Sequence, residues 1–132
     1  MGSLAGLLKS QGFRVTGSDR NLYPPMSTAL ENWGIPIKLG FCPEHVLDDP
    51  PDLVVVGNSV RSDNPEACAA LEAGFSVSSF PDALYDHAIR GKHSIVVAGT
   101  HGKSTTTAMT ATLLDSAGLS PSAVVGARRA GF

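Results

Sequence analysis

Residues 94–107 constrain the fold more than any other stretch of this sequence. They read Ser-Ile-Val-Val-Ala-Gly-Thr-His-Gly-Lys-Ser-Thr-Thr-Thr. The β-branched run at 95–97 predicts a buried strand, and the small residues after it predict a tight turn. The residues that follow are compatible with a helix over 103–117 that ends at Gly118. The order strand, glycine-containing turn and helix is typical of α/β folds.

The turn also has the composition of a phosphate-binding loop. Gly99 and Gly102 allow backbone N–H groups to surround phosphate oxygens, and the helix N-terminus adds the positive end of its dipole. Lys103 would then lie along the β- and γ-phosphates, and the Ser104 hydroxyl would hold Mg2+. The general pattern G-x-x-x-x-G-K-[ST] is matched incompletely, because Val97 takes the place of its first glycine. The alternative is an ordinary strand-to-helix turn with a surface lysine.

Composition limits the other functions open to the chain. Its 132 residues are 42% hydrophobic, as in a globular domain, and a net charge of −2 gives no reason to expect a nucleic-acid partner. No apolar run approaches the roughly 20 residues of a membrane helix, and no secretory signal is evident. Cys42 and Cys68 are far apart, which indicates reduced cysteines of a cytoplasmic protein. Scattered histidines make zinc improbable, so Mg2+ accompanying ATP is the expected metal.

The N-terminal residues predict part of a nucleotide-binding sheet. Residues 1–9 have the spacing of a helix, with Gly12 as its C-cap, and a strand over 13–16 leads into Gly17, Ser18 and Asp19. Helix, strand and terminal acid form the second half of a β-α-β unit, in which the acid often binds a ribose hydroxyl. Asp19 could equally be a turn residue or a helix N-cap. The first strand and its glycine-rich turn are absent, so we expect Met1 to be internal and the chain to be a fragment.

Further strands and helices alternate up to residue 91. Expected helices cover 25–33, with Met26, Leu30 and Trp33 as the buried face, then 44–47, a segment from Pro65 towards Gly74 capped by Asn64, and 81–89. Expected strands cover 35–40, 52–57 and 75–79, and the continuous apolar run at 52–57 is typical of a parallel sheet. Asn58 and Ser59 follow that run, where doubly wound sheets bind ligands, although they could simply cap the turn.

These patterns predict an α/β fold in two parts. Residues 1–91 would form a Rossmann-like parallel-sheet domain that lacks its first strand, and polar residues 90–93 would mark the boundary. Residues 92–132 would begin a P-loop ATPase domain, with its next strand at 122–125.

The phosphate loop resembles the ATP loop of the Mur ligase family, in the branch that acts on UDP-N-acetylmuramate. The resemblance extends over essentially the whole chain, and includes residues 17–19 and 64–66. Residues 17–28, with their Tyr-Pro-Pro-Met-Ser run, look most like the members that add L-Ala-γ-D-Glu-meso-diaminopimelate in cell-wall recycling. Ser104 stands where threonine is commonest in this branch, and keeps the hydroxyl ligand.

The resemblance implies a three-domain amide ligase that uses ATP and Mg2+ and proceeds through an acyl phosphate. Lys103 would be catalytic, Ser104 would bind Mg2+, and Asp19, Asn58 and Ser59 would contact the UDP-sugar. The nucleotide-binding loop would consist of Gly99, Thr100, His101, Gly102, Lys103, Ser104 and Thr105. Because the later metal ligands and the C-terminal domain are not in this sequence, we expect the 132 residues alone to be inactive.

Three alternatives remain open at this point. One is the L-alanine-adding ligase of the same branch. Another is a nucleotide-binding module without ligase chemistry. The third is a generic α/β domain whose loop residues match by coincidence.

Overall fold

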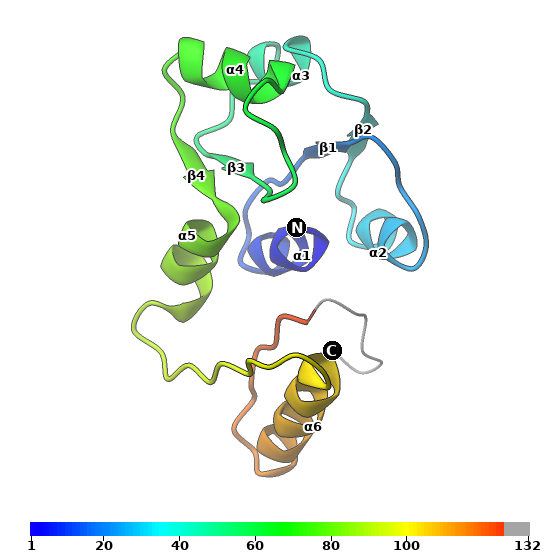
Figure 1. Ribbon diagram of the computed structural model, residues 1–132, viewed down its shortest axis with the longest axis vertical. Helices are drawn as coiled ribbons and strands as arrows, with labels where there is room; N and C mark the ends of the chain where they lie inside the picture. Colours follow the sequence, from blue (N-terminus) through cyan, green and yellow to red (C-terminus); the bar gives the residue numbers. More distant parts are fainter. Residues whose placement is uncertain (126–132) are drawn as a thin grey trace. The chain divides into compact units, whose positions relative to one another are not determined.

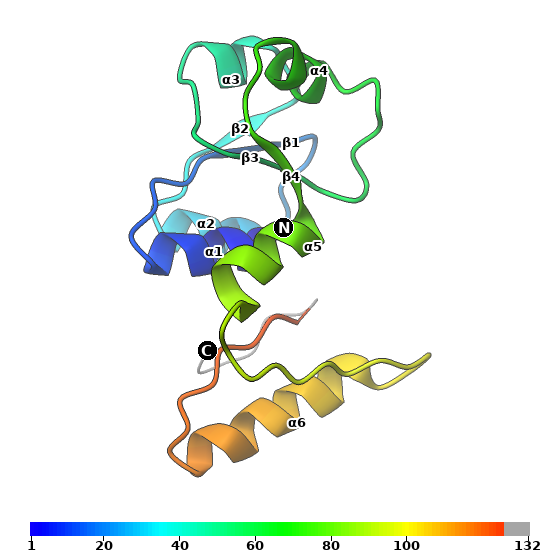
Figure 2. The same ribbon diagram turned by 90° about the vertical axis from the view of Figure 1, so that its left-hand side faces the viewer.

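The computed structural model describes residues 1–125, which divide into two compact units between Lys92 and His93. Figures 1 and 2 show the elements of each unit along the chain. The first unit contains α1 (Gly2–Ser10), β1 (Gly17–Asp19), α2 (Met26–Asn32), β2 (Ile37–Leu39), α3 (Glu44–Leu47), β3 (Val54–Val56), α4 (Pro65–Glu72), β4 (Val77–Ser79), α5 (Phe80–Leu84) and the π-helical turn η1 (Tyr85–Ile89). The second unit contains α6 (Lys103–Ser116).

The strands of the first unit pair in parallel, as an α/β fold requires. β1 pairs with β2, so that Gly17 lies opposite Ile37, and β3 pairs with β4, so that Val54 lies opposite Val77. The four strands therefore form two separate two-stranded sheets rather than the single sheet that the sequence predicted. A doubly wound sheet has the strand order 3-2-1-4-5-6, which places its first strand between the positions that β1 and β3 hold here. The two sheets separate between β1 and β3, the position that the first strand takes in that order.

Helices α1 and α2 pack closely because α1 carries glycine on the contacting face. A Cβ atom added to Gly6 would lie 2.6 Å from the ring of Trp33, and one added to Gly2 would lie 2.3 Å from the sulfur of Met26. Leu30 is buried, as predicted for this face of α2. Trp33 was also predicted to be buried, but it is 39% exposed, because its ring covers α1 near the surface.

Helix α4 begins at the predicted N-cap. The side chain of Asn64 accepts hydrogen bonds from the backbone N–H groups of Glu66 at 3.0 Å and Ala67 at 3.1 Å, and Pro65 occupies the first turn. Two backbone donors that the helix itself cannot pair are thereby satisfied. Asn64 is buried, so water cannot replace this cap.

The second unit confirms the predicted helix but neither predicted strand. Helix α6 ends one residue before the expected position, and Gly118 follows with a φ of +76°. Residues 95–97 and 122–125 are not in strands, and among the described residues of this unit neither segment has a ladder partner. Val96 is 82% exposed, whereas a strand in a parallel sheet is covered on both faces. An apolar run becomes a strand only where another strand pairs with it.

Within residues 1–125, no helix is both long enough and apolar enough to cross a membrane.

The buried cap of α4 gives a stability prediction. We expect Asn64→Ala to lower the free energy of unfolding by about 1–2 kcal/mol, because it leaves two backbone N–H groups unpaired at a buried helix start. Asn64→Ser should retain most of the stability, since its hydroxyl can also cap. Asn32→Ala, at an exposed asparagine, serves as the matched control. Urea unfolding followed by circular dichroism measures all three. Equal losses for Asn64→Ala and Asn32→Ala would contradict the role of the cap.

Candidate functional site

A cavity of about 440 Å3 lies at the carboxyl ends of three strands in the first unit. Parallel α/β sheets bind ligands at this edge. The cavity brings together Asp19 and Ser59, two of the residues predicted from the sequence, whereas Asn58 is not among its lining residues. Its walls are Asp19, Arg20, Asn21, Phe41, Ser59, Val60, Arg61, Asp63, Asn64 and Pro65.

Two arginines, Arg20 and Arg61, line the cavity together with Asp19 and Asp63. The Arg20 guanidinium lies 5.9 Å from the centroid of the Phe41 ring. Arg61 donates from Nε to Asp63 Oδ1 at 3.2 Å, but both side chains are more than two-thirds exposed, so this ion pair contributes little to stability. Arginine is well suited to binding phosphate oxygens through its planar set of donors.

Asp19 also has a local role. Its Oδ1 atom accepts a hydrogen bond of 3.4 Å from the backbone N–H of Asn21, which is the turn geometry that aspartate favours. The turn interpretation considered from the sequence therefore describes part of what this side chain does. Its carboxylate nonetheless lines the cavity.

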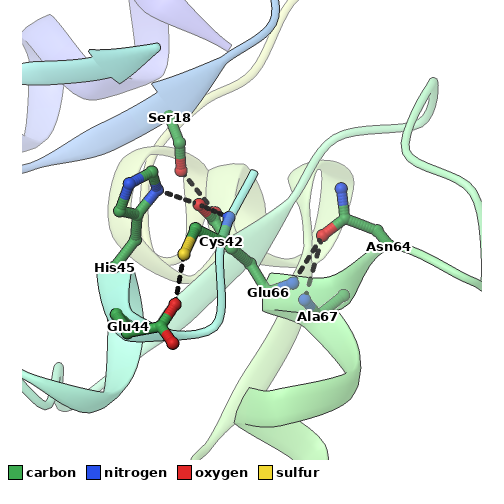
Figure 3. A network of polar contacts seen from close by, with 7 residues as sticks. All are labelled: Ser18, Cys42, Glu44, His45, Asn64, Glu66 and Ala67. Atoms are coloured by element: carbon green, nitrogen blue, oxygen red, sulfur yellow. Dashed lines mark hydrogen bonds and ion pairs between the residues drawn. The ribbon is translucent and has the colours of Figure 1, made fainter. Parts of the chain in front are cut away.

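A buried carboxylate lies behind the cavity wall. Glu66 accepts hydrogen bonds from the Ser18 hydroxyl, from the backbone N–H of Cys42 at 3.2 Å and from Nδ1 of His45 (Figure 3). These donors come from β1, from the segment after β2 and from α3. The Glu66 side chain is 11% exposed, and the three donors offset the cost of removing its charge from water.

Cys42 is held in its thiol form by a neighbour. Its Sγ donates a hydrogen bond to Glu44 Oε2, which raises the pKa of the Cys42 thiol and lowers the pKa of Glu44 (Figure 3). A thiol with a raised pKa has little thiolate at neutral pH and is a poor nucleophile. Cys42 and Cys68 are both free cysteines.

The predicted phosphate loop is formed by a turn and the first residues of α6. Gly102 is the N-cap and has a φ of +75°, in the left-handed region that favours glycine. Lys103 folds back over the loop, and its Nζ donates to the carbonyl oxygens of Gly99 at 2.8 Å and Thr100 at 3.3 Å. His101 Nδ1 lies 3.2 Å from the Thr100 hydroxyl oxygen.

The chemistry of this loop suits a nucleotide phosphate and its Mg2+. The backbone N–H of Thr106 makes the bond to Gly102 O, at 2.9 Å, that begins the helix. The N–H groups of Lys103, Ser104 and Thr105 precede that bond, at the positive end of the helix dipole. All three side chains are exposed, so an ammonium and two hydroxyls are accessible beside these donors.

Sequence reasoning missed several residues of the cavity and its support, among them Arg20, Phe41, Arg61 and Glu66. Arg20 and Phe41 each follow a strand within two residues, so the rule that predicted Asp19 could have included them. No local signal indicated Glu66, since its partners are distant in sequence.

Comparison with known proteins decides the family. A family model described as the Mur ligase family, catalytic domain, matches residues 1–92. The chain belongs to the Mur ligase family. This confirms the resemblance noted in the sequence. The phosphate loop lies beyond the matched residues, so its role stays a prediction.

Two curated members of the Mur ligase family match nearly the whole chain. Both are named UDP-N-acetylmuramate–L-alanyl-gamma-D-glutamyl-meso-2,6-diaminoheptandioate ligase. The protein from Escherichia coli (strain K12) is 44% identical over 126 residues, and that from Haemophilus influenzae is 42% identical over 126 residues. Each alignment covers 96% of this chain. The chain spans about a quarter of the length of these relatives, 27% and 28% respectively.

Solved structures of Mur ligases have the same fold. The UDP-N-acetylmuramate:L-alanyl-gamma-D-glutamyl-meso-diaminopimelate ligase from Neisseria meningitides aligns with a TM-score of 0.92 and 38% identity. The alignment covers 100% of this chain and 41% of that one. A murein peptide ligase from Psychrobacter arcticus 273-4 aligns with a TM-score of 0.83 and 47% identity, covering 89% of this chain and 24% of that one.

The left-handed glycines at the two ends of α6 provide a matched test of the loop. Gly102→Ala and Gly118→Ala each force alanine into a φ near +75°, at a cost of about 1–2 kcal/mol, and neither new Cβ meets an atom within 4 Å. We expect both variants to lose similar stability, but only Gly102→Ala to weaken ATP binding, measured by calorimetry. If Gly118→Ala weakens ATP binding equally, the loop has no special role.

Proposed function

We propose that this chain is part of an ATP-dependent amide ligase that joins L-Ala-γ-D-Glu-meso-diaminopimelate to UDP-N-acetylmuramate in peptidoglycan recycling. The observation that carries the proposal is the identity of 44% and 42%, over 96% of the chain, to two ligases named for that reaction. The chain supplies about a quarter of such a protein, so the reaction is proposed for the longer protein.

In this proposal the first unit binds the UDP-sugar in the cavity at the strand ends. The Asp19 carboxylate accepts a hydrogen bond from a ribose hydroxyl, and Ser59 contacts the nucleotide from the neighbouring loop. Arg20 and Arg61 offer donors to the diphosphate. Asn58, which is exposed and adjacent to Ser59, takes a peripheral part at most.

The second unit supplies the residues that bind ATP. Backbone N–H groups of the loop from Gly99 to Thr105 surround the phosphates, and Lys103 exchanges its carbonyl partners for phosphate oxygens. The Ser104 hydroxyl is the ligand for Mg2+, which when bound neutralises charge on the transferring phosphoryl group.

The reaction follows from holding the two substrates in fixed positions. The muramoyl carboxylate attacks the terminal phosphorus of ATP, which gives an acyl phosphate and ADP. The peptide amine then attacks the activated carbonyl, the amide bond forms, and inorganic phosphate leaves. Lys103 stabilises the developing negative charge in the first step.

Phosphate release tests this proposal and identifies the amine. The protein, expressed from its complete reading frame, is incubated with ATP, Mg2+ and UDP-N-acetylmuramate, and then with the tripeptide or with L-alanine. We expect release that depends on the tripeptide. Dependence on L-alanine would instead assign the biosynthetic reaction, and ATP binding without release in either case would indicate a nucleotide-binding module.

Replacing the loop lysine tests its role in the same assay. Lys103→Ala should lower kcat by about 100-fold or more, because a donor to the transferring phosphoryl group is lost. Lys38→Ala removes an exposed lysine of β2 and should leave turnover unchanged. Retention of full activity by Lys103→Ala would exclude the proposed catalytic role.

A further inference from the structure

We propose that Glu66 is a positioning residue for the nucleotide cavity. Its buried carboxylate holds the cavity residues in place and thereby sets the affinity for the UDP-sugar. The inference rests on the proposed function, because it assigns the cavity to that ligand. Glu66 does not line the cavity, so it acts only through the residues beside it.

Two of the donors to Glu66 are direct neighbours of cavity residues along the chain. Ser18, which donates to Glu66 Oε2, immediately precedes Asp19 in the cavity wall. Cys42, whose backbone N–H donates to Oε1 at 3.2 Å, immediately follows Phe41 in the wall. The backbone N–H of Gly40 already joins the two strand ends by a bond of 2.9 Å to Asp19 O, and the Glu66 carboxylate holds both ends against α4.

The backbone of Glu66 is also held in place at the start of α4. Its backbone N–H donates to the Asn64 side chain, and Asn64 and Pro65 are also wall residues. His45 Nδ1 contacts Oε1 and closes the network from α3 (Figure 3). The polar contacts therefore connect three parts of the wall that lie far apart in the sequence.

Burial makes these contacts strong enough to matter for binding. Glu66 is 9% exposed, so water cannot replace its hydrogen bonds, and a site preorganised by buried bonds does not spend binding energy on ordering its loops. Loss of these bonds should therefore weaken the affinity for the ligand of this cavity. It should not change the affinity for ATP, whose proposed loop is in the other unit.

The test compares steady-state kinetics of variants in the protein expressed from its complete reading frame. Glu66→Ala should raise KM for UDP-N-acetylmuramate about 10-fold or more, with KM for ATP and kcat within about twofold of the parent. Ser18→Ala removes one contact and should raise the same KM by about fivefold. Glu72→Ala, an exposed carboxylate on the same helix, is the matched control and should change nothing.

Glu66→Gln provides the conservative variant, and Ser18→Ala covers the case in which Glu66→Ala fails to fold. The amide oxygen can still accept from Cys42 and His45, and the amide nitrogen can donate to the Ser18 hydroxyl, so most of the affinity should return.

The outcomes separate this inference from the proposed function. A parent protein that does not use UDP-N-acetylmuramate would overturn the proposed function. A parent that uses it, with unchanged KM in Ser18→Ala and, where it folds, in Glu66→Ala, would overturn only the positioning role. Equal losses in both KM values and in kcat would show general destabilisation and would also overturn it.

Discussion

The buried carboxylate of Glu66 is the interaction on which the first unit most depends. A charge removed from water is costly unless several donors surround it, and here the donors come from elements that share no other polar contact with α4 among the described residues. The same bonds that stabilise the charge hold the ends of β1 and β2 beside α4. Stability and the shape of the cavity are thereby coupled through one side chain.

Local signals in the sequence predicted most of the elements. Asn64 and Pro65 indicated the start of α4, Gly118 indicated the end of α6, and the run at Val54–Val56 indicated a strand in a parallel sheet. Each of these features depends on residues within one or two turns of chain. Pairing between strands depends on residues far apart in the sequence. For this reason residues 95–97 were wrongly predicted as a strand, and two sheets form where a single sheet was predicted.

The candidate site likewise contains residues that local patterns predict and residues whose role depends on distant contacts. Asp19 and Ser59 could be predicted, because ligand sites lie at the carboxyl ends of parallel strands, although the strand expected over 13–16 is β1 at Gly17–Asp19, so Asp19 ends its strand while Ser59 follows β3. That rule does not say which of two neighbours faces the cavity, so Asn58 was included although it is not among the lining residues. Glu66 could not be predicted, since its role exists only where three distant segments meet.

A crystal structure of the protein expressed from its complete reading frame, with UDP-N-acetylmuramate bound, would test the central claim most directly. We expect the nucleotide in the cavity of the first unit, in contact with Asp19 and Ser59, with Glu66 still accepting from Ser18 and from the Cys42 N–H. A nucleotide bound elsewhere, or bound in this cavity with the Glu66 contacts broken, would contradict it.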